Sequence, residues 1–307
     1  MPSKKKPRHR QAHLHSWARI DRAGAMHNAR VHLGAAYDLL EVDADFGLNA
    51  LQQAYTIRAD TRPSLTSFAA LLVFHRAMDL LDGLSVLIRA GCVQPMIPLL
   101  RSYLESAMSA RYLMTVNDER IAASYVVSQP LAEVAGLEER AGEHAGGSRP
   151  TIVAREGRQH IESMLAEDRL FREARNELAR LNLSSSVPVP WFQAFGGPRT
   201  LGGLSRRLKD EQLEKTFARF FDRWSAAAHV SDTLHSLAPA IADVTNAGEL
   251  FTDLRSPSRK DIVGVVYVCH HLFLRLMVHQ AEYFREVPTG MTEYRALEAR
   301  LRACLEE

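Results

Sequence analysis

The residues best suited to chemistry lie between positions 220 and 231. Arg223 and His229 are separated by five residues, and Ser225 lies between them, four residues before the histidine. In a regular helix, residues six apart differ by about 120° around the axis and about 9 Å along it. Arg223 and His229 therefore do not share one face of such a helix. To act on one phosphate, they need a helix end at the motif or a second copy of it from another protomer.

Ser225 and His229 are neighbours on a helix surface, so the serine hydroxyl can orient the imidazole. A second polar pair, Arg101 and Glu105, has the same spacing in a segment otherwise rich in leucine and methionine. If this pair is buried, it needs further polar partners. Ser225 or His229 can supply them. The alternative is a salt bridge at the protein's rim that has no chemical role.

These motifs resemble those of the HEPN superfamily, whose ribonucleases carry R-x4-6-H in an all-α bundle. The chain is more closely similar to an uncharacterised bacterial family that combines R-x-x-x-E on an early helix with a later S-x-x-x-H segment. Here the two motifs run from Arg101 to Glu105 and from Ser225 to His229. The resemblance covers roughly residues 64–286. One departure is Trp224-Ser225-Ala226, which replaces the polar residue often found directly after the arginine.

The resemblance implies metal-independent cleavage of RNA by a dimer, of toxin or defence type. His229 would move protons between the ribose 2′-OH and the leaving oxygen, because imidazole titrates near neutral pH. Arg223 would stabilise charge developing on the phosphate. Arg101, Glu105 and Ser225 would support them. An antitoxin or a defence-system protein would be the partner.

Two other functions stay open. In a non-catalytic interaction module, the same motif only stabilises packing, with His229 at a helix end and Arg223 in solvent. A nucleotide-binding sensor is also compatible with a HEPN-like fold.

No cofactor or metal site is expected. The chain has no HExxH, GxSxG, Walker A or GxGxxG segment. His271 and His279 are eight residues apart, about 12 Å along a helix, which is too far for both to bind one ion. Ser225, His229 and Asp232 do not make a hydrolase triad, because one helix face provides neither an exposed nucleophile nor an oxyanion hole.

The amino-terminal segment is strongly basic. Residues 1–30 carry a net charge of +7, against −5 for the rest of the chain. Such an arm can hold phosphates electrostatically, with an affinity that falls as salt rises. The alternative is a solvated tail. The candidate nucleic-acid contacts are Lys4, Lys5, Lys6, Arg8 and Arg10.

Helical periodicity recurs along most of the chain and alternating strand patterns are almost absent, which predicts an all-α protein. We expect a HEPN-like helical bundle at about 64–129 and 201–286, with a helical insertion at about 130–200. Residues 1–22 would form the arm and residues 23–307 a single domain. The expected helices cover residues 23–40, 48–58, 65–90, 95–115, 118–129, 131–144, 151–183, 201–228, 262–284 and 291–305, with a loop at 184–199.

Several local signals mark the ends of these elements. Ser64 caps the helix at 65–90 and Gly91 ends it, and this helix forms an antiparallel hairpin with the next one. Trp191, Phe192 and Phe195 anchor the loop. Ser258 and Asp261 resemble a capping box before the helix at 262–284. That helix is expected to bury one broad face, made of Val263, Val266, Tyr267, His270, Phe273, Leu274 and Met277.

Composition fits a soluble globular protein, with 46% hydrophobic and 24% charged residues. The longest apolar stretch, Ile262 to Cys269, is far shorter than the roughly 20 residues of a membrane-spanning helix. We therefore expect no membrane segment. The three cysteines lack CxxC spacing, which favours a reducing, cytoplasmic location.

Overall fold

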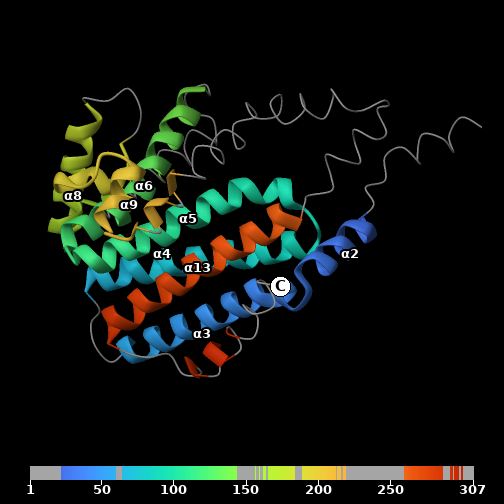
Figure 1. The fold of residues 1–307 in the computed structure, drawn as a ribbon. Coiled ribbons are helices and arrows are strands. Elements are labelled where there is room, and N and C mark those ends of the chain that lie inside the picture. Colours follow the sequence, from blue (N-terminus) through green and yellow to red (C-terminus); the bar gives the residue numbers. More distant parts are fainter. Residues whose placement is uncertain are drawn as a thin grey trace, which may run out of the picture.

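The computed structural model of the protein is helical throughout its regular elements (Figure 1). No β-strand occurs in the part of the chain that it describes, so the predicted all-α class is confirmed there. The described residues are 22–59, 64–143, 156, 159, 162–163, 165–183, 189–211, 213–215, 217–218, 259–285, 291–292, 294–296 and 299.

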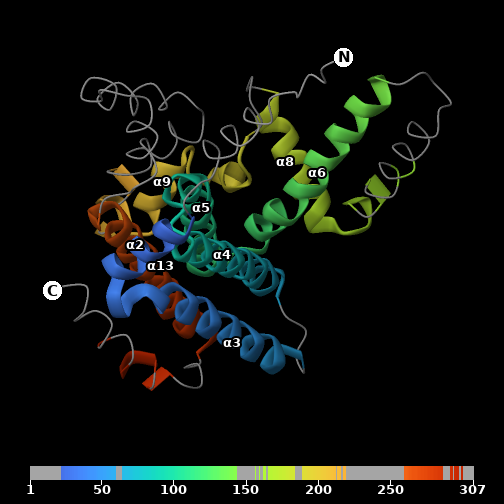
Figure 2. The same cartoon turned by 90° about the vertical axis from the view of Figure 1, so that its right-hand side faces the viewer.

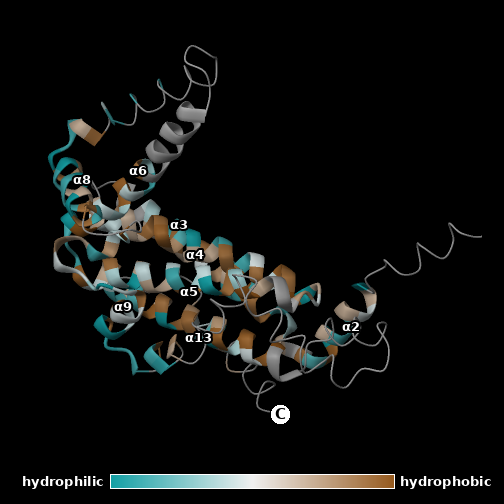
Figure 3. Ribbon diagram, turned by 90° about the horizontal axis from the view of Figure 1, so that it is seen from above, coloured by the Kyte–Doolittle hydropathy of each residue, from teal (hydrophilic) through white to brown (hydrophobic). Residues whose placement is uncertain are grey.

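Four long helices form a bundle around the main core. They are α3 (Leu39–Ala59), α4 (Leu65–Arg89), α5 (Val93–Val116) and α13 (Arg259–Phe284). α4 and α5 form the expected hairpin, while α13 packs on both α5 and α3, and α3 packs on α4 (Figure 1). Within the bundle, each of these four helices therefore packs on two of the others, and their buried apolar residues belong to one core cluster. Hydrophobic residues recur along these helices (Figure 3).

Local sequence signals explain the two ends of α4. Its N-cap is Ser64, whose hydroxyl accepts a hydrogen bond from the Ser67 backbone N–H at 3.1 Å. After the helix, Gly91 has a φ of +69°, a value that favours glycine. A Cβ at this position would lie only 2.5 Å from the carbonyl oxygen of Ala25. Gly91 therefore reverses the chain after α4 and leaves room for the backbone of α2 (Arg22–Leu33) to pack against it.

The carboxy-terminal helix α13 contributes one broad face to the core, as its spacing predicts. Val266, His270, Phe273 and Met277 are buried. Tyr267 was expected on the same face but is half exposed. It lies one residue after Val266, about 100° further around the helix, and so outside the buried stripe.

A smaller second unit projects from one end of the bundle (Figure 2). It comprises α6 (Glu119–Glu143), α8 (Arg169–Asn182) and the 3-10 segment η2 (Trp191–Gly196), which share a small apolar cluster. The aromatic residues predicted to anchor the loop do so, because Trp191 packs against Tyr112 and Tyr125 with ring centroids 6.1 and 5.2 Å apart.

Two predicted boundaries near the ends of these units are wrong. The expected break between helices at residues 41–47 lies instead at η1 (Gly34–Asp38), between α2 (Arg22–Leu33) and α3. Gly34 has a φ of +52°, which ends α2 early. The break expected at Pro130 is absent, because α6 continues through it. A proline removes one helical hydrogen bond, and the surrounding turns can tolerate that loss.

Two further helices are shorter than predicted. The segment expected to be helical from 151 to 183 bends at Asp168, whose carboxylate accepts hydrogen bonds from the first N–H groups of α8. The helix expected at residues 201–228 is interrupted after its first part, α9 (Leu201–Arg207). A new turn starts after Asp210, following Lys209 with a φ of +51°. Acidic N-caps thus divide both segments.

By length and composition alone, Ile262–Phe284 within α13 is apolar enough to cross a membrane. Half of its most apolar window is buried inside the fold. A core helix passes the same test.

Candidate functional site

The supporting pair of the predicted site lies on a partly exposed face of α5. Arg101, Ser102 and Glu105 are partly accessible, whereas Tyr103 and Leu104 between them are fully buried. The alternation follows the helical repeat, which sets residues three and four apart on one face. α5 therefore presents a polar strip while its remaining faces pack into the bundle.

Within this strip, the predicted ion pair is formed. Nε of Arg101 lies 3.1 Å from Oε1 of Glu105, and the two side chains are 28% and 39% exposed. The pair is therefore neither the buried pair nor the fully solvated rim bridge considered from the sequence. Part of the surface of each side chain is therefore accessible.

The remaining predicted site residues lie outside the described part of the chain. These are Arg223, Ser225 and His229, together with Lys4, Lys5, Lys6, Arg8 and Arg10 of the basic arm. The capping box predicted at Ser258 and Asp261 is likewise outside the described side chains.

The described residues on either side of the Arg223–His229 segment lie against α5. On the amino-terminal side, Asp210 contacts Arg111 of α5, and Leu213 is buried in the main core. On the carboxy-terminal side, α13 packs on α5, where the Tyr103 hydroxyl donates to the carbonyl oxygen of Cys269 at 3.3 Å. Residues before and after the segment in the sequence therefore both contact α5, the helix that carries Arg101 and Glu105.

The sequence did not indicate a second ion pair of α5, which is more buried than Arg101–Glu105. Nη2 of Arg111 lies 2.9 Å from Oδ2 of Asp210, and the side chains are 3% and 7% exposed. Oδ1 of Asp210 also accepts the backbone N–H of Leu213 at 3.0 Å, capping the turn that follows. The available signals were an arginine between apolar residues near the end of α5 and an aspartate before a new turn.

The pair perturbs the ionisation of its own members. Burial lowers the pKa of Arg111, and the Asp210 carboxylate opposes that effect. Burial alone would raise the pKa of Asp210, but the Leu213 N–H and Arg111 together lower it. Asp210 is therefore held as a carboxylate.

Two α13 residues complete this charged cluster. Nε of Arg275 lies 3.8 Å from the same Asp210 oxygen, and its side chain is 48% exposed. Nδ1 of His279 lies 3.1 Å from the Arg275 carbonyl oxygen. Burial and the Arg111 cation lower the pKa of His279, which favours its neutral form. The cluster therefore holds two cations and one anion.

A second buried polar cluster joins α3, α13 and the carboxy-terminal residues. The Asp43 carboxylate lies 2.8 Å from Nδ1 of His270 and accepts the hydroxyl of Tyr294, and all three residues are buried. Burial, followed by the Asp43 charge, raises the pKa of the neighbouring Cys269 thiol. Because water does not reach these groups, we assign the cluster a packing role.

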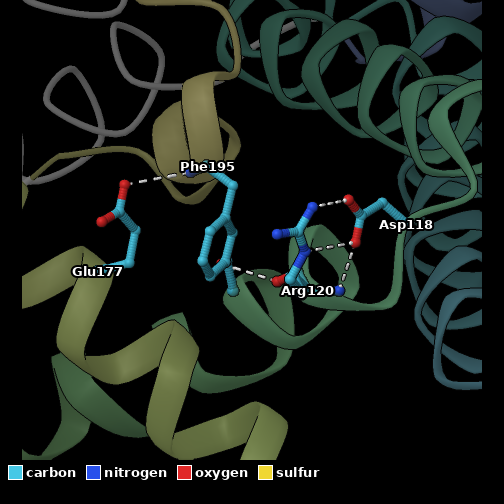
Figure 4. Close-up of polar contacts among 5 residues, drawn as sticks. Asp118, Arg120, Glu177 and Phe195 are labelled. Carbon is cyan, nitrogen blue, oxygen red and sulfur yellow. Dashed lines mark hydrogen bonds and ion pairs between the residues drawn. The ribbon is translucent and has the colours of Figure 1, made fainter.

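A third set of polar contacts fastens the second unit together (Figure 4). Arg120 forms an ion pair with Asp118 at 2.9 Å, and its guanidinium carbon lies 5.2 Å from the centre of the Phe195 ring. The Phe195 N–H donates to Glu177 of α8 at 3.3 Å. These contacts join the start of α6 to η2 and α8, and they are structural rather than catalytic.

Within the residues that the structure describes, no group of three or more histidine, cysteine, aspartate or glutamate side chains is placed to hold a metal ion.

Comparison with protein families matches residues 67–238 to a family of unknown function, DUF5677. The matched region includes Arg101, Glu105, Ser225 and His229. No curated protein and no solved structure matches the chain.

Proposed function

The chain belongs to DUF5677, and we propose that it is a metal-independent endoribonuclease of toxin or defence type that acts as a dimer. Its substrate would be RNA, and its partner an antitoxin or another protein of a defence system. In this proposal Arg223 and His229 are the catalytic residues, and Arg101, Glu105 and Ser225 support them.

The observation that carries the proposal is the state of the Arg101–Glu105 pair. This pair is held at intermediate exposure on a polar strip, beside buried Tyr103 and Leu104. An arginine that is positioned by a carboxylate and whose side chain is partly exposed is well suited to bind a phosphate.

The flanking contacts give this strip a connection to the catalytic motif. Residues shortly before the motif and helix α13 after it both pack on α5. We infer that His229 acts on a phosphate that Arg101 helps to bind. His229 then takes the ribose 2′-OH proton and returns a proton to the leaving oxygen, so that no metal is needed.

The test is cleavage of a mixed RNA pool by the full chain, with and without chelator. We expect cleavage by the wild type, and a loss of at least about 100-fold in His229→Ala, the lower end of what general acid–base catalysis contributes. His75→Ala is the matched control, because His75 is an exposed histidine on α4. An inert wild type, or a His229→Ala variant as active as His75→Ala, would instead support the non-catalytic module.

A further inference from the structure

The outward side of α13 is more apolar than a helix face in contact with water usually is. By composition, Ile262–Phe284 is apolar enough to cross a membrane, yet only half of its most apolar window is buried. α13 packs on α5, α3 and α2, and it runs along the outer edge of the bundle (Figures 1 and 3). In a globular protein, the side of a helix that faces water is normally polar or charged. An apolar outward side therefore indicates a further contact.

The accessible apolar residues of this side form one stripe. Leu274, Val278 and Ala281 follow one another at intervals of four and three residues, which places them in line along the helix. Val278 is 44% exposed, and Leu274 and Ala281 are partly accessible. Intervals of four and three residues are those of a seam at which two helices pack side by side. The stripe is therefore suited to a second helix.

The charged residues beside the stripe indicate which helix fits. Arg275 comes three residues before Val278 and Glu282 four residues after it, and all three are exposed. The contact of Arg275 with Asp210 is long, at 3.8 Å, and leaves about half of the Arg275 side chain exposed. The outward side of α13 thus carries one cation and one anion, on opposite sides of an apolar centre.

Such a pattern is complementary to itself when two copies pack antiparallel. With Val278 at the two-fold axis, Arg275 of each copy lies opposite Glu282 of the other, and Leu274 lies opposite Ala281. The small Ala281 side chain allows the two helices to approach closely. A parallel arrangement would instead bring like charges together, which is unfavourable.

We propose that the outward side of α13 is the interface between two copies of this chain, packed antiparallel about Val278. The inference rests on the dimer of the proposed function, but it does not rest on cleavage, because the interface includes neither Arg223 nor His229. The self-complementary charges favour a second copy over an unrelated helix.

The first test measures the dissociation constant of the dimer by analytical ultracentrifugation of the full chain. Val278→Glu places two carboxylates at the two-fold axis, and it should raise this constant at least about 100-fold because like charges then face each other in the interface. Val86→Glu is the matched control, since Val86 is an exposed valine on α4, at 58%. Thermal unfolding of both variants checks that they remain folded.

A second substitution tests the antiparallel register. Glu282→Arg places an arginine opposite Arg275 of the partner subunit at both ends of the interface, and it should raise the dissociation constant about tenfold. Glu214→Arg is the control, because Glu214 is an exposed glutamate outside α13. A wild type that is monomeric at micromolar concentration would overturn the interface, and it would mean that α13 is covered by another part of the chain. A dimer that neither substitution weakens would also overturn it.

The outcomes differ from those of the cleavage test. An inert dimer that Val278→Glu dissociates would support the interface and refute the nuclease. A monomer that cleaves RNA would refute the interface and leave the cleavage chemistry in place.

Discussion

Asp210 is the single residue on which the charge balance beside α5 depends. It neutralises buried Arg111 and caps the turn that begins at residue 211. The pair places two opposite charges side by side, and it makes the fold sensitive to the loss of either partner, because a lone buried charge is costly.

We expect Asp210→Asn to lower the free energy of unfolding by about 3–5 kcal/mol at pH 7, since it leaves Arg111 uncompensated. Urea denaturation measures this loss. The control is Glu211→Gln, whose ion pair with Lys215 is exposed and should contribute about 0.5 kcal/mol or less. Equal effects of the two substitutions would mean that Arg111 is solvated.

The same substitution has a pH dependence with a defined sign. The fold lowers the pKa of Asp210 from its ordinary value of 3.8. Its stabilising effect is therefore present above about pH 4 and is lost as the pH falls through the lowered value. The difference between wild type and Asp210→Asn should accordingly shrink in acid.

At the scale of secondary structure, α5 has two different roles along its length. Near its start, the Arg101–Glu105 pair is partly open to solvent. Further along, Arg111 is enclosed by α13 and the residues after α9. One helix therefore carries an accessible ion pair and a buried one, and substitutions in the two pairs should differ in their effects.

Glu105→Gln should change the free energy of unfolding by only about 0.3–0.5 kcal/mol, the usual contribution of an exposed i,i+4 pair. If the pair positions Arg101 for a phosphate, the same variant should cleave RNA markedly more slowly. Thermal unfolding and a single-turnover cleavage assay measure the two effects. A stable variant that cleaves RNA like the wild type would show that the pair takes no part in catalysis.

At the scale of the whole molecule, the R-x5-H spacing predicts self-association. Arg223 and His229 are six residues apart, so one regular helix cannot direct both at one phosphate, whereas two facing copies can. Light scattering at micromolar concentration should therefore give twice the chain mass of 34.4 kDa. A strict monomer that still cleaves RNA would show that the motif lies at a helix end.

Much of the architecture could be predicted from neighbouring residues alone. Periodicity identified the long helices, and Ser64 and Gly91 marked the two ends of α4. Both signals act within a few residues, through a capping hydroxyl and a backbone conformation that glycine tolerates. The Arg101–Glu105 pair is equally local, because four residues on a helix bring the side chains together.

The predictions that failed concern features that local residues leave open. The sequence around Pro130 permits either a break or a continuous helix, and α6 continues through this position while it packs on the bundle and on α8. The exposure of the Arg101–Glu105 pair could not be predicted either. The i,i+4 spacing brings the two side chains into contact, but it does not say which helices pack beside them.

By itself, the sequence determined an all-α chain, most of its helices and one ion pair, because these depend on contacts within about one helical turn. Only the tertiary structure decided which distant polar groups meet. His270 and Asp43 are 227 residues apart, and Arg111 and Asp210 lie on separate elements. Their helical patterns give no indication of a partner. Burial in a shared interface removes water from each group, and it thereby makes the pairing necessary.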